Sequence, residues 1–360
     1  MKKIIVFAFI ILSSQAYSQQ AQNLIIITTD GFRWQDVFTG MDSAIANNPK
    51  FNQGDSEEIF KKYWSADPMR RRKKLMPFLW STIEENGQVY GDRLFGNKVN
   101  NANRYWFSYP GYNEIFTGFP DTLVNSNSYQ ANPNTTLLDF LNKQPGFSKK
   151  VAAFGAWNAF ERIFNREKSG LPVVNAFDNT GGNHPNANET MINKMRADSY
   201  RPFGDDECLD VFTHYAAMEF LMNKKPRVLY ISYGETDEWA HSGHYEDYLN
   251  AAHQVDKWIH DIWTYIQQDP FYKNKTAIFI TTDHGRGDAK KEDWTSHNSK
   301  FPGSNQIWFA AIGAGIKAKG EIKKTDQLYQ EQFAQTMAGL LGLIFTAEHP
   351  IGKKILLNAE

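Results

Sequence analysis

The chain has 360 residues, of which 41% are hydrophobic, 22% are charged and 14% are aromatic. This composition is that of a globular protein with a large core, and it excludes a disordered chain. Lysine and arginine total 39 against 40 aspartate and glutamate residues, which argues against a general nucleic-acid binder. The single cysteine, Cys208, excludes an internal disulfide framework and a zinc site made of several thiolates. Any metal chemistry must therefore use histidine and carboxylate side chains.

The first residues have the pattern of an export signal. Lys2 and Lys3 precede an apolar run at 4–12, and Ala16-Tyr17-Ser18 has the small residues of a cleavage site. The run is far shorter than the roughly 20 apolar residues that span a bilayer. We therefore predict a signal peptide at 1–18, cleavage near Ser18/Gln19, and a periplasmic or secreted mature protein with no stable membrane anchor.

Five short apolar segments rich in β-branched or aromatic residues predict buried strands, at 24–28, 151–154, 228–232, 277–281 and 307–312. Apolar residues recur at three- and four-residue steps from Leu249 to Ile266, which predicts a helix. Residues 210–222 predict another helix, and Asp326 is placed to cap a third that runs through Gln332 to Leu343. Strands that alternate with helices predict an α/β fold with a mostly parallel central sheet and helices on both faces.

Three polar stretches interrupt this alternation, near 41–74, 121–134 and 178–206. They lack strong periodicity, so we predict loops inserted on the face that carries the ligand. The rest of the pattern predicts a single domain over residues 19–360.

Acidic and histidine residues directly follow three of the predicted strands. Asp30 follows 24–28, Asp237 and His241 follow 228–232, and Asp283 and His284 follow 277–281. Ligands bind beyond the carboxyl ends of strands in open α/β sheets, so we expect these groups to meet at one edge. Gathered carboxylates repel one another and lose hydration, and a divalent cation removes that cost. A mixed histidine and carboxylate shell suits zinc better than calcium or magnesium.

Each of these residues has an alternative role when it is taken singly. An aspartate after a strand often caps the next helix, and the Asp-Gly pair at Asp30 is a common turn. Asp237 and His241 are four residues apart, which puts both on one face of a helical turn. His297, upstream of the last predicted strand, is a further candidate ligand. The three strand ends taken together favour a metal site over capping.

Ser108 is the candidate nucleophile. It stands before a helical stretch in which Pro110 suits the first turn and Gly118 suits the C-terminal stop. Free N–H groups and the helix dipole at that N-terminus favour a bound anion. Taken alone, Ser108 could equally cap the helix, but a serine oxygen bound to a metal is a competent nucleophile.

Together these motifs resemble the alkaline phosphatase superfamily, particularly its type I phosphodiesterase/nucleotide pyrophosphatase branch. The resemblance runs from Asp30 to His297 in four ordered motifs, which are Asp30-Gly31-Phe32-Arg33, Ser108-Tyr109-Pro110 through Phe116-Thr117-Gly118, Asp237-x-x-x-His241 and Asp283-His284-Gly285. It implies an alkaline phosphatase-like catalytic domain with two zinc ions. It further implies that one ion is held by Asp237, His241 and His297, and the other by Asp30, Ser108, Asp283 and His284.

The resemblance implies a phosphoric ester hydrolase in which Ser108 attacks phosphorus and forms a covalent phosphoserine-type intermediate. Much of the phosphodiesterase branch has threonine at that position. Asn113 and Arg104 are candidate donors to the substrate, although a surface role fits Arg104 equally well. Residues 155–160 lack lysine and arginine, and Trp157 suggests an apolar wall for a second substituent. This favours a phosphodiester or pyrophosphate bond weakly over a monoester.

Two alternatives stay open. A sulfuric ester hydrolase of the same superfamily needs Cys or Ser followed by x-Pro-x-Arg for conversion to formylglycine, and Tyr112 stands at the arginine position. A catalytically silent protein that keeps the fold and binds metal is the other. The expected partner is a small-molecule phosphate ester, with no specific binding to duplex nucleic acid. The natural substrate and the oligomeric state are not set by the sequence.

Overall fold

The structure is a computed structural model that describes residues 20–359. The predicted signal peptide at 1–18 lies outside the described residues. Within the described range, no helix has both the length and the apolar character that a membrane crossing requires.

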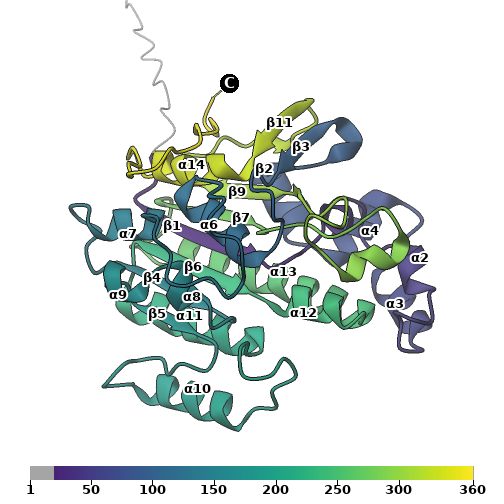
Figure 1. The fold of residues 1–360 in the computed structure, drawn as a ribbon, viewed down its shortest axis with the longest axis horizontal. Helices are drawn as coiled ribbons and strands as arrows, with labels where there is room; N and C mark the ends of the chain where they lie inside the picture. Colours follow the sequence, from purple (N-terminus) through teal and green to yellow (C-terminus); the bar gives the residue numbers. More distant parts are fainter. Residues whose placement is uncertain (1–19, 360) are drawn as a thin grey trace, which may run out of the picture.

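An eight-stranded sheet forms the centre of the fold, in the order β10-β2-β9-β7-β1-β6-β4-β5 (Figure 1). Among these strands, β9 runs antiparallel to β7 and β2, and the other neighbouring pairs are parallel. The predicted α/β fold with a mostly parallel sheet is thereby confirmed. The strands are β1 (Asn23–Thr29), β2 (Gly87–Tyr90), β4 (Val151–Gly155), β5 (Val173–Asn175), β6 (Val228–Tyr233), β7 (Thr276–Thr281), β9 (Phe309–Gly313) and β10 (Gly320–Glu321).

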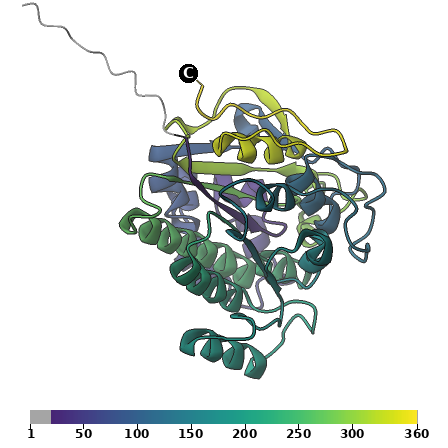
Figure 2. The same ribbon diagram turned by 90° about the vertical axis from the view of Figure 1, so that its left-hand side faces the viewer.

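The sheet is covered on both faces, and β1 shows why. Every residue of β1 is buried, and its side chains alternate between two core clusters. Ile25 and Ile27 pack in one cluster with helices α11 (Asp210–Lys224) and α13 (Tyr245–Gln268). Leu24 and Ile26 pack in the other cluster with helices α6 (Ser108–Thr117) and α14 (Phe333–Leu340). Figures 1 and 2 show α13 and α14 on opposite sides of the sheet. A strand buried on both faces is apolar at successive positions, as this one is.

Of two predictions about the C-terminal third, one is wrong and the other is confirmed in part. Asp326 does not cap a helix, because Asp326–Tyr329 forms strand β11, which pairs with β3 (Asn97–Asn100) in a second, three-stranded sheet. The helix begins later, with a 3-10 turn at Gln330–Gln332 followed by α14. The strand predicted at 307–312 is interrupted at Trp308, because β8 (Gln306–Ile307) pairs with β3 and β9 pairs with β7.

Two of the three predicted loop segments contain helices. Segment 41–74 holds α2 (Ser43–Ala46), α3 (Ser56–Tyr63) and most of α4 (Pro68–Leu75), and segment 178–206 holds α10 (Ala187–Asp198). Local caps stabilise them, since Asp42 and Asp67 accept hydrogen bonds from the first turns of α2 and α4. Segment 121–134 contains no helix or strand, as predicted. The other helical segments are α1 (Trp34–Thr39), a π-helical turn (Leu79–Ile83), α5 (Glu84–Asn86), a 3-10 turn (Arg93–Phe95), α7 (Leu137–Asn142), α8 (Phe160–Ile163), α9 (Arg166–Ser169), α12 (Glu235–His241) and a 3-10 turn (Lys291–Thr295).

A buried ion pair fixes the segment that follows β1. Arg33 and Asp36 are 4% and 0% exposed, and Arg33 Nε lies 2.7 Å from Asp36 Oδ2. Tyr245 and Tyr248 of α13 donate hydrogen bonds of 2.8 and 2.9 Å to the same carboxylate. The chain beyond Asp30 is therefore anchored to α13.

Asp36→Asn removes this carboxylate charge and leaves the Arg33 guanidinium buried without a counter-ion. We expect the free energy of unfolding to fall by about 3–5 kcal/mol, measured by urea denaturation. Asp261→Asn is the control, because it breaks the exposed pair with Lys257 (2.9 Å), whose contribution should be below about 1 kcal/mol. Similar losses in the two variants would contradict this account of the anchor.

Candidate active site

The carboxyl ends of three adjacent strands bring three aspartates together. Strand β1 lies between β7 and β6 (Figure 1). Asp30, Asp237 and Asp283 follow the carboxyl ends of these parallel strands and therefore lie at the same edge of the sheet. Backbone contacts fix them, since the Asp30 N–H donates to Tyr233 O (2.9 Å) and the Gly31 N–H donates to Asp283 Oδ1 (3.1 Å). The three residues are 7%, 8% and 0% exposed respectively, so their charges are held away from bulk water.

The first group of candidate ligands is Asp30, Asp283 and His284, whose ligand atoms lie within 4.8 Å of one another. His284 Nε2 is 3.3 Å from Asp30 Oδ1 and 3.4 Å from Asp283 Oδ2. Among the described residues, those two carboxylate oxygens are buried and have no hydrogen-bond partner. Converging, unpaired carboxylate oxygens are what a cation site requires.

The second group lies against the first and contains Asp237, His284 and His297, again within 4.8 Å. His241 joins it, with Nε2 at 3.0 Å from Asp237 Oδ2 and 2.9 Å from His297 Nε2. The rings of His284 and His297 stack at 3.9 Å between centroids. Apart from Ser108, six residues were predicted as metal ligands, and the structure brings all six together. His284 belongs to both groups.

Ser108 faces this cluster rather than capping its helix. Phe107 is the N-cap of α6, and Ser108 Oγ lies 3.3 Å from His284 Nε2. The helix can approach so closely because residue 111 is glycine, where a Cβ would meet Asp283 O at 2.5 Å. Glu114 holds the preceding loop by accepting from the N–H groups of Ala102 and Asn103, and burial raises its pKa to about 7.

Most N–H groups at the start of this helix, where an anion site was predicted, are occupied by contacts within the protein. The Tyr109 N–H donates to Asn127 Oδ1 (2.9 Å), and Pro110 has no N–H to offer. The Gly111 N–H is bonded to Phe107 O (3.0 Å). The helix start therefore positions Ser108, and a bound phosphate would depend on other groups.

The charges at the site are strongly coupled. The pKa of Asp30 is raised mainly by burial and secondly by the charge of Asp237. The pKa of Asp283 is raised well above its usual value, mainly by burial and secondly by the charge of Asp30. Although burial opposes the change, His241 and Arg286 hold the pKa of Asp237 well below the usual range. Although burial opposes it too, Asp283 raises the pKa of His284 to about 9. The buried carboxylates thus favour a positive charge beside them.

Sequence reasoning missed two residues that hold the ligands. Arg286, 1% exposed, contacts Asp237 and donates to Trp294 O (2.5 Å) and Thr295 O (2.8 Å). Tyr112, fully buried, donates to Asp30 Oδ2 (2.9 Å). Arg286 directly follows the Asp283-His284-Gly285 motif, and Tyr112 lies four residues after Ser108 on the same helix face. Those spacings are the sequence signal that could have identified them.

The three predicted substrate residues are placed differently. Arg104 is exposed. Asn113 is buried, donates to Phe119 O (2.9 Å) and accepts from Asn132 (3.1 Å) and Asn134 (3.2 Å), so its amide holds the loop after α6 and is not free for a substrate. Trp157 is half-buried just beyond the carboxyl end of β4, at the edge that carries the aspartates.

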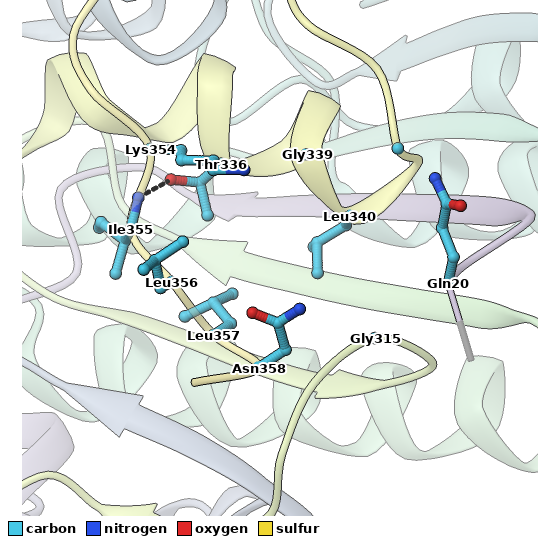
Figure 3. Close-up of a pocket in the computed structure, with 11 residues that line it drawn as sticks. Gln20, Gly315, Thr336, Gly339, Leu340, Lys354, Ile355, Leu356, Leu357 and Asn358 are labelled. Carbon is cyan, nitrogen blue, oxygen red and sulfur yellow. Dashed lines mark hydrogen bonds between the residues drawn. The ribbon is translucent and has the colours of Figure 1, made fainter. Parts of the chain in front are cut away.

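A separate pocket of about 320 Å³ lies far from this chemistry (Figure 3). It is bounded by Gln20, by α14 and by the segment from Lys354 to Asn358, where the Ile355 N–H donates to Thr336 Oγ1 (2.8 Å). Gln20 precedes β1 whereas Asp30 follows it, so the pocket is at the opposite edge of the sheet from the aspartates.

Comparisons with solved structures define the class of protein. The fold matches the alkaline phosphatase PafA with a TM-score of 0.61 at 11% identity, over 93% of this chain and 98% of that one. It matches BT1596, a 2-O GAG sulfatase, with a TM-score of 0.55 at 15% identity, over 91% and 72%. The lipoteichoic acid synthase LtaP from Listeria monocytogenes gives 0.52 at 13%, over 95% and 75%. A comparison with curated proteins found no match. The chain has the alkaline phosphatase fold.

The sequence also matches the family model of type I phosphodiesterase / nucleotide pyrophosphatase over residues 38–342. This match covers most of the chain, which therefore belongs to that family. The resemblance inferred from the motifs is confirmed, and the protein is a member of a superfamily of hydrolases that act on phosphoryl or sulfuryl esters. Asp30 lies before the matched range, and the structure brings it beside the motifs within it.

Gly31 provides a test of how the ligands are held. Its φ is +57°, and a Cβ at that position would lie 2.4 Å from Asp237 Oδ1. If these groups hold a metal ion, Gly31→Ala should displace Asp237 and weaken divalent-cation binding by about 10–100-fold, measured with Zn²⁺ as the probe in competition with a chromophoric chelator. Gly182→Ala is the matched control, with a φ of +58° and nothing within 4 Å. An equal loss in both variants would point to backbone strain instead of displacement.

Proposed function

We propose that this protein is a two-zinc phosphoric ester hydrolase that works through a covalent phosphoserine-type intermediate at Ser108. The observation that carries the proposal is the position of Ser108 Oγ, 3.3 Å from the one histidine that belongs to both candidate ligand groups. A nucleophile beside paired cations is the arrangement used for in-line displacement at phosphorus. Membership in a phosphodiesterase family supports the same reaction class.

The donor set fits zinc. It combines three imidazoles with three carboxylates, and zinc prefers such mixed nitrogen and oxygen ligands. Asp237, His241 and His297 would hold one ion, and Asp30, Ser108, Asp283 and His284 the other. The unpaired oxygens of Asp30 and Asp283 support this assignment. When bound, zinc supplies positive charge for phosphate oxygens and lowers the pKa of hydroxyl groups and water.

The chain's own residues account for the two displacements. In the first, Ser108 Oγ loses its proton to solvent and forms a bond to phosphorus, the bond from phosphorus to the leaving oxygen breaks, and the leaving group is protonated by solvent. In the second, a water oxygen bonds to phosphorus, the Ser108–phosphorus bond breaks, and Oγ regains a proton. The tight packing of α6 on Asp283 keeps Oγ in place for both steps.

A diester or pyrophosphate bond fits the surroundings better than a monoester. A monoester carries an extra negative charge that a free cationic side chain would have to match. Arg286 is buried and committed to Asp237 and to two backbone carbonyls, so it is not available for that charge. Trp157 offers an apolar surface to a second substituent.

The formylglycine chemistry of sulfatases finds less support. Tyr112 stands where that chemistry has arginine, and its hydroxyl donates to Asp30, so the position serves the metal ligands. Mass spectrometry should find residue 108 as unmodified serine. Formylglycine there would replace our proposal with sulfuric ester hydrolysis.

The pattern at 1–18 supports export, and we propose that the mature chain begins near Gln19 and acts on a small-molecule phosphate ester outside the cytoplasm. N-terminal sequencing of the protein produced from the full chain should therefore begin near Gln19. A mature protein that retains Met1 would contradict export by this route.

Ser108→Ala should lower kcat for an aryl phosphodiester by at least about 1,000-fold in the zinc-loaded protein, because it removes the atom that attacks phosphorus. The exposed Ser242, next to His241, gives the control variant Ser242→Ala, which should keep wild-type turnover. Acid quenching during turnover should trap phosphate on Ser108 in the wild type, detected by mass spectrometry. Hydrolysis that persists in Ser108→Ala would remove the proposed nucleophile.

Chelation should abolish turnover, and added zinc should restore it. A protein with full zinc occupancy that hydrolyses none of a panel of aryl phosphate mono- and diesters would instead be the catalytically silent alternative.

A further inference from the structure

A cavity of about 780 Å³ lies at the outermost strand of the central sheet. Its lining residues come mainly from β10 and the residues that flank it, from β11, and from the C-terminal segment at 354–359, and we call it the edge cavity. Strands β2 and β9 separate β10 from β7, the nearest strand that leads to a candidate metal ligand. Neither Ser108 nor any candidate ligand lines the edge cavity, so it is separate from the candidate active site.

Four exposed lysines line the edge cavity, and three of them have no acidic partner. Lys319, Lys323 and Lys324 flank β10, and Lys354 lies in the C-terminal segment. Lys323 Nζ lies 3.6 Å from Glu321 Oε2. Within residues 20–359, the other three lysines form no ion pair with a carboxylate. Ammonium groups that are gathered without counter-ions favour the binding of an anion.

The two carboxylates of the edge cavity leave this positive charge in excess. Glu321 accepts two hydrogen bonds from the buried Arg72, at 2.8 and 3.1 Å, so its charge is already matched. Asp326 is exposed, and its Oδ1 accepts the N–H of the next residue (2.8 Å). Four lysines against two carboxylates leave an excess of two positive charges among the lining residues.

The edge cavity also has an apolar part. Ile322 and Ile355 are half-buried and pack against the core cluster that contains Tyr90 and Leu328. Leu356 is 55% exposed. Pockets that combine apolar side chains with a few charged groups bind ligands that have both characters. The ligand expected here therefore has an anionic group and an apolar group.

The shape of the surroundings favours an elongated ligand. Lys354, Ile355 and Leu356 also line the 320 Å³ pocket of Figure 3, so the two cavities adjoin along the C-terminal segment. A compact inorganic anion would leave most of this apolar surface uncovered, whereas a chain can follow it.

Hydrogen bonds of the backbone fix the segments that carry the unpaired lysines. The Lys319 N–H donates to the first carbonyl of β2 (2.9 Å), and the Lys324 carbonyl accepts from Asn97 Nδ2 (3.0 Å). The N–H of the residue after Lys354 donates to Thr336 Oγ1 of α14 (2.8 Å). The positions from which these side chains extend are therefore set before a ligand binds, which lowers the entropy cost of binding.

We propose that the edge cavity binds a soluble organic anion with an apolar chain, whose anionic group contacts Lys319, Lys324 and Lys354 and whose chain packs on Ile355 and Leu356. A flat membrane surface fits less well, because these lysines line a concave surface. The proposal does not rest on the proposed function, since it concerns binding at residues outside the candidate active site.

The test is calorimetric titration of the full-length mature protein with 1-octanesulfonate below the concentration at which it forms micelles. This probe is an anion with an apolar chain, and it carries no ester bond to hydrolyse. We expect the double variant Lys324→Gln/Lys354→Gln to bind it at least about tenfold more weakly than the wild type, because two charged contacts are lost. Lys273→Gln/Lys300→Gln is the matched control, since it removes the same charge from exposed lysines outside the cavity and should keep the wild-type affinity.

Chain length tests the apolar part. Ethanesulfonate should bind at least about tenfold more weakly than 1-octanesulfonate, because it buries fewer methylene groups. Leu356→Ser should narrow this difference, and its side chain is exposed enough for the fold to tolerate the change. Leu123→Ser, at a leucine that is 69% exposed and outside the cavity, should preserve the difference.

An affinity for 1-octanesulfonate that is unchanged in Lys324→Gln/Lys354→Gln would overturn the proposal, and so would equal affinities for the short and the long sulfonate. Octyltrimethylammonium that binds as tightly as 1-octanesulfonate would show that the lysines do not select an anion. Binding to vesicles that contain phosphatidylglycerol, without binding to soluble 1-octanesulfonate, would replace the proposed site with a membrane-docking surface.

Discussion

Mutual repulsion among Asp30, Asp237 and Asp283 is the constraint on which the rest of the site depends. The order β7-β1-β6 forces these carboxylates into one buried volume, where each has lost hydration. Some of these carboxylate oxygens accept hydrogen bonds, which come from Arg286, from Tyr112 and from the backbone N–H of Gly31. One oxygen each of Asp30 and Asp283 remains unpaired among the described residues. The same repulsion therefore favours a cation at this edge of the sheet.

Holding Ser108, the proposed nucleophile, beside these carboxylates requires support from distant parts of the chain. Asn101 donates to the carbonyl of Asp283 (2.7 Å), and so does Gln330 (2.8 Å), which lies in the turn before α14. The C-terminal segment therefore contributes to the site although it supplies no ligand. Such supporting contacts fix the Asp283 loop and the Ser108 helix relative to each other, and the proposed catalysis depends on that relation.

The fold class and the meeting of the candidate ligand residues at one sheet edge could be predicted from sequence because their signals are local. A continuous apolar run such as that of β1 indicates a strand buried on both faces, and an Asp or His directly after it indicates the ligand edge. Contacts between distant segments were not predictable in this way. The pairing of Asp326 with β3 turned an apparent helix cap into a strand, and the antiparallel β-bridge that pairs Trp157 with Glu207 has no local signature. The helices in 41–74 were missed because each is only four or eight residues long, which is too short for a repeating pattern to be distinguished from a loop.

Anomalous X-ray diffraction at the zinc edge from crystals of the zinc-loaded mature protein tests the central claim most directly. The account predicts two zinc peaks about 4 Å apart, one bounded by Asp30, Ser108, Asp283 and His284, and the other by Asp237, His241 and His297. A single peak remote from Ser108, or no zinc at these carboxylates in a protein that hydrolyses phosphate esters, would contradict it.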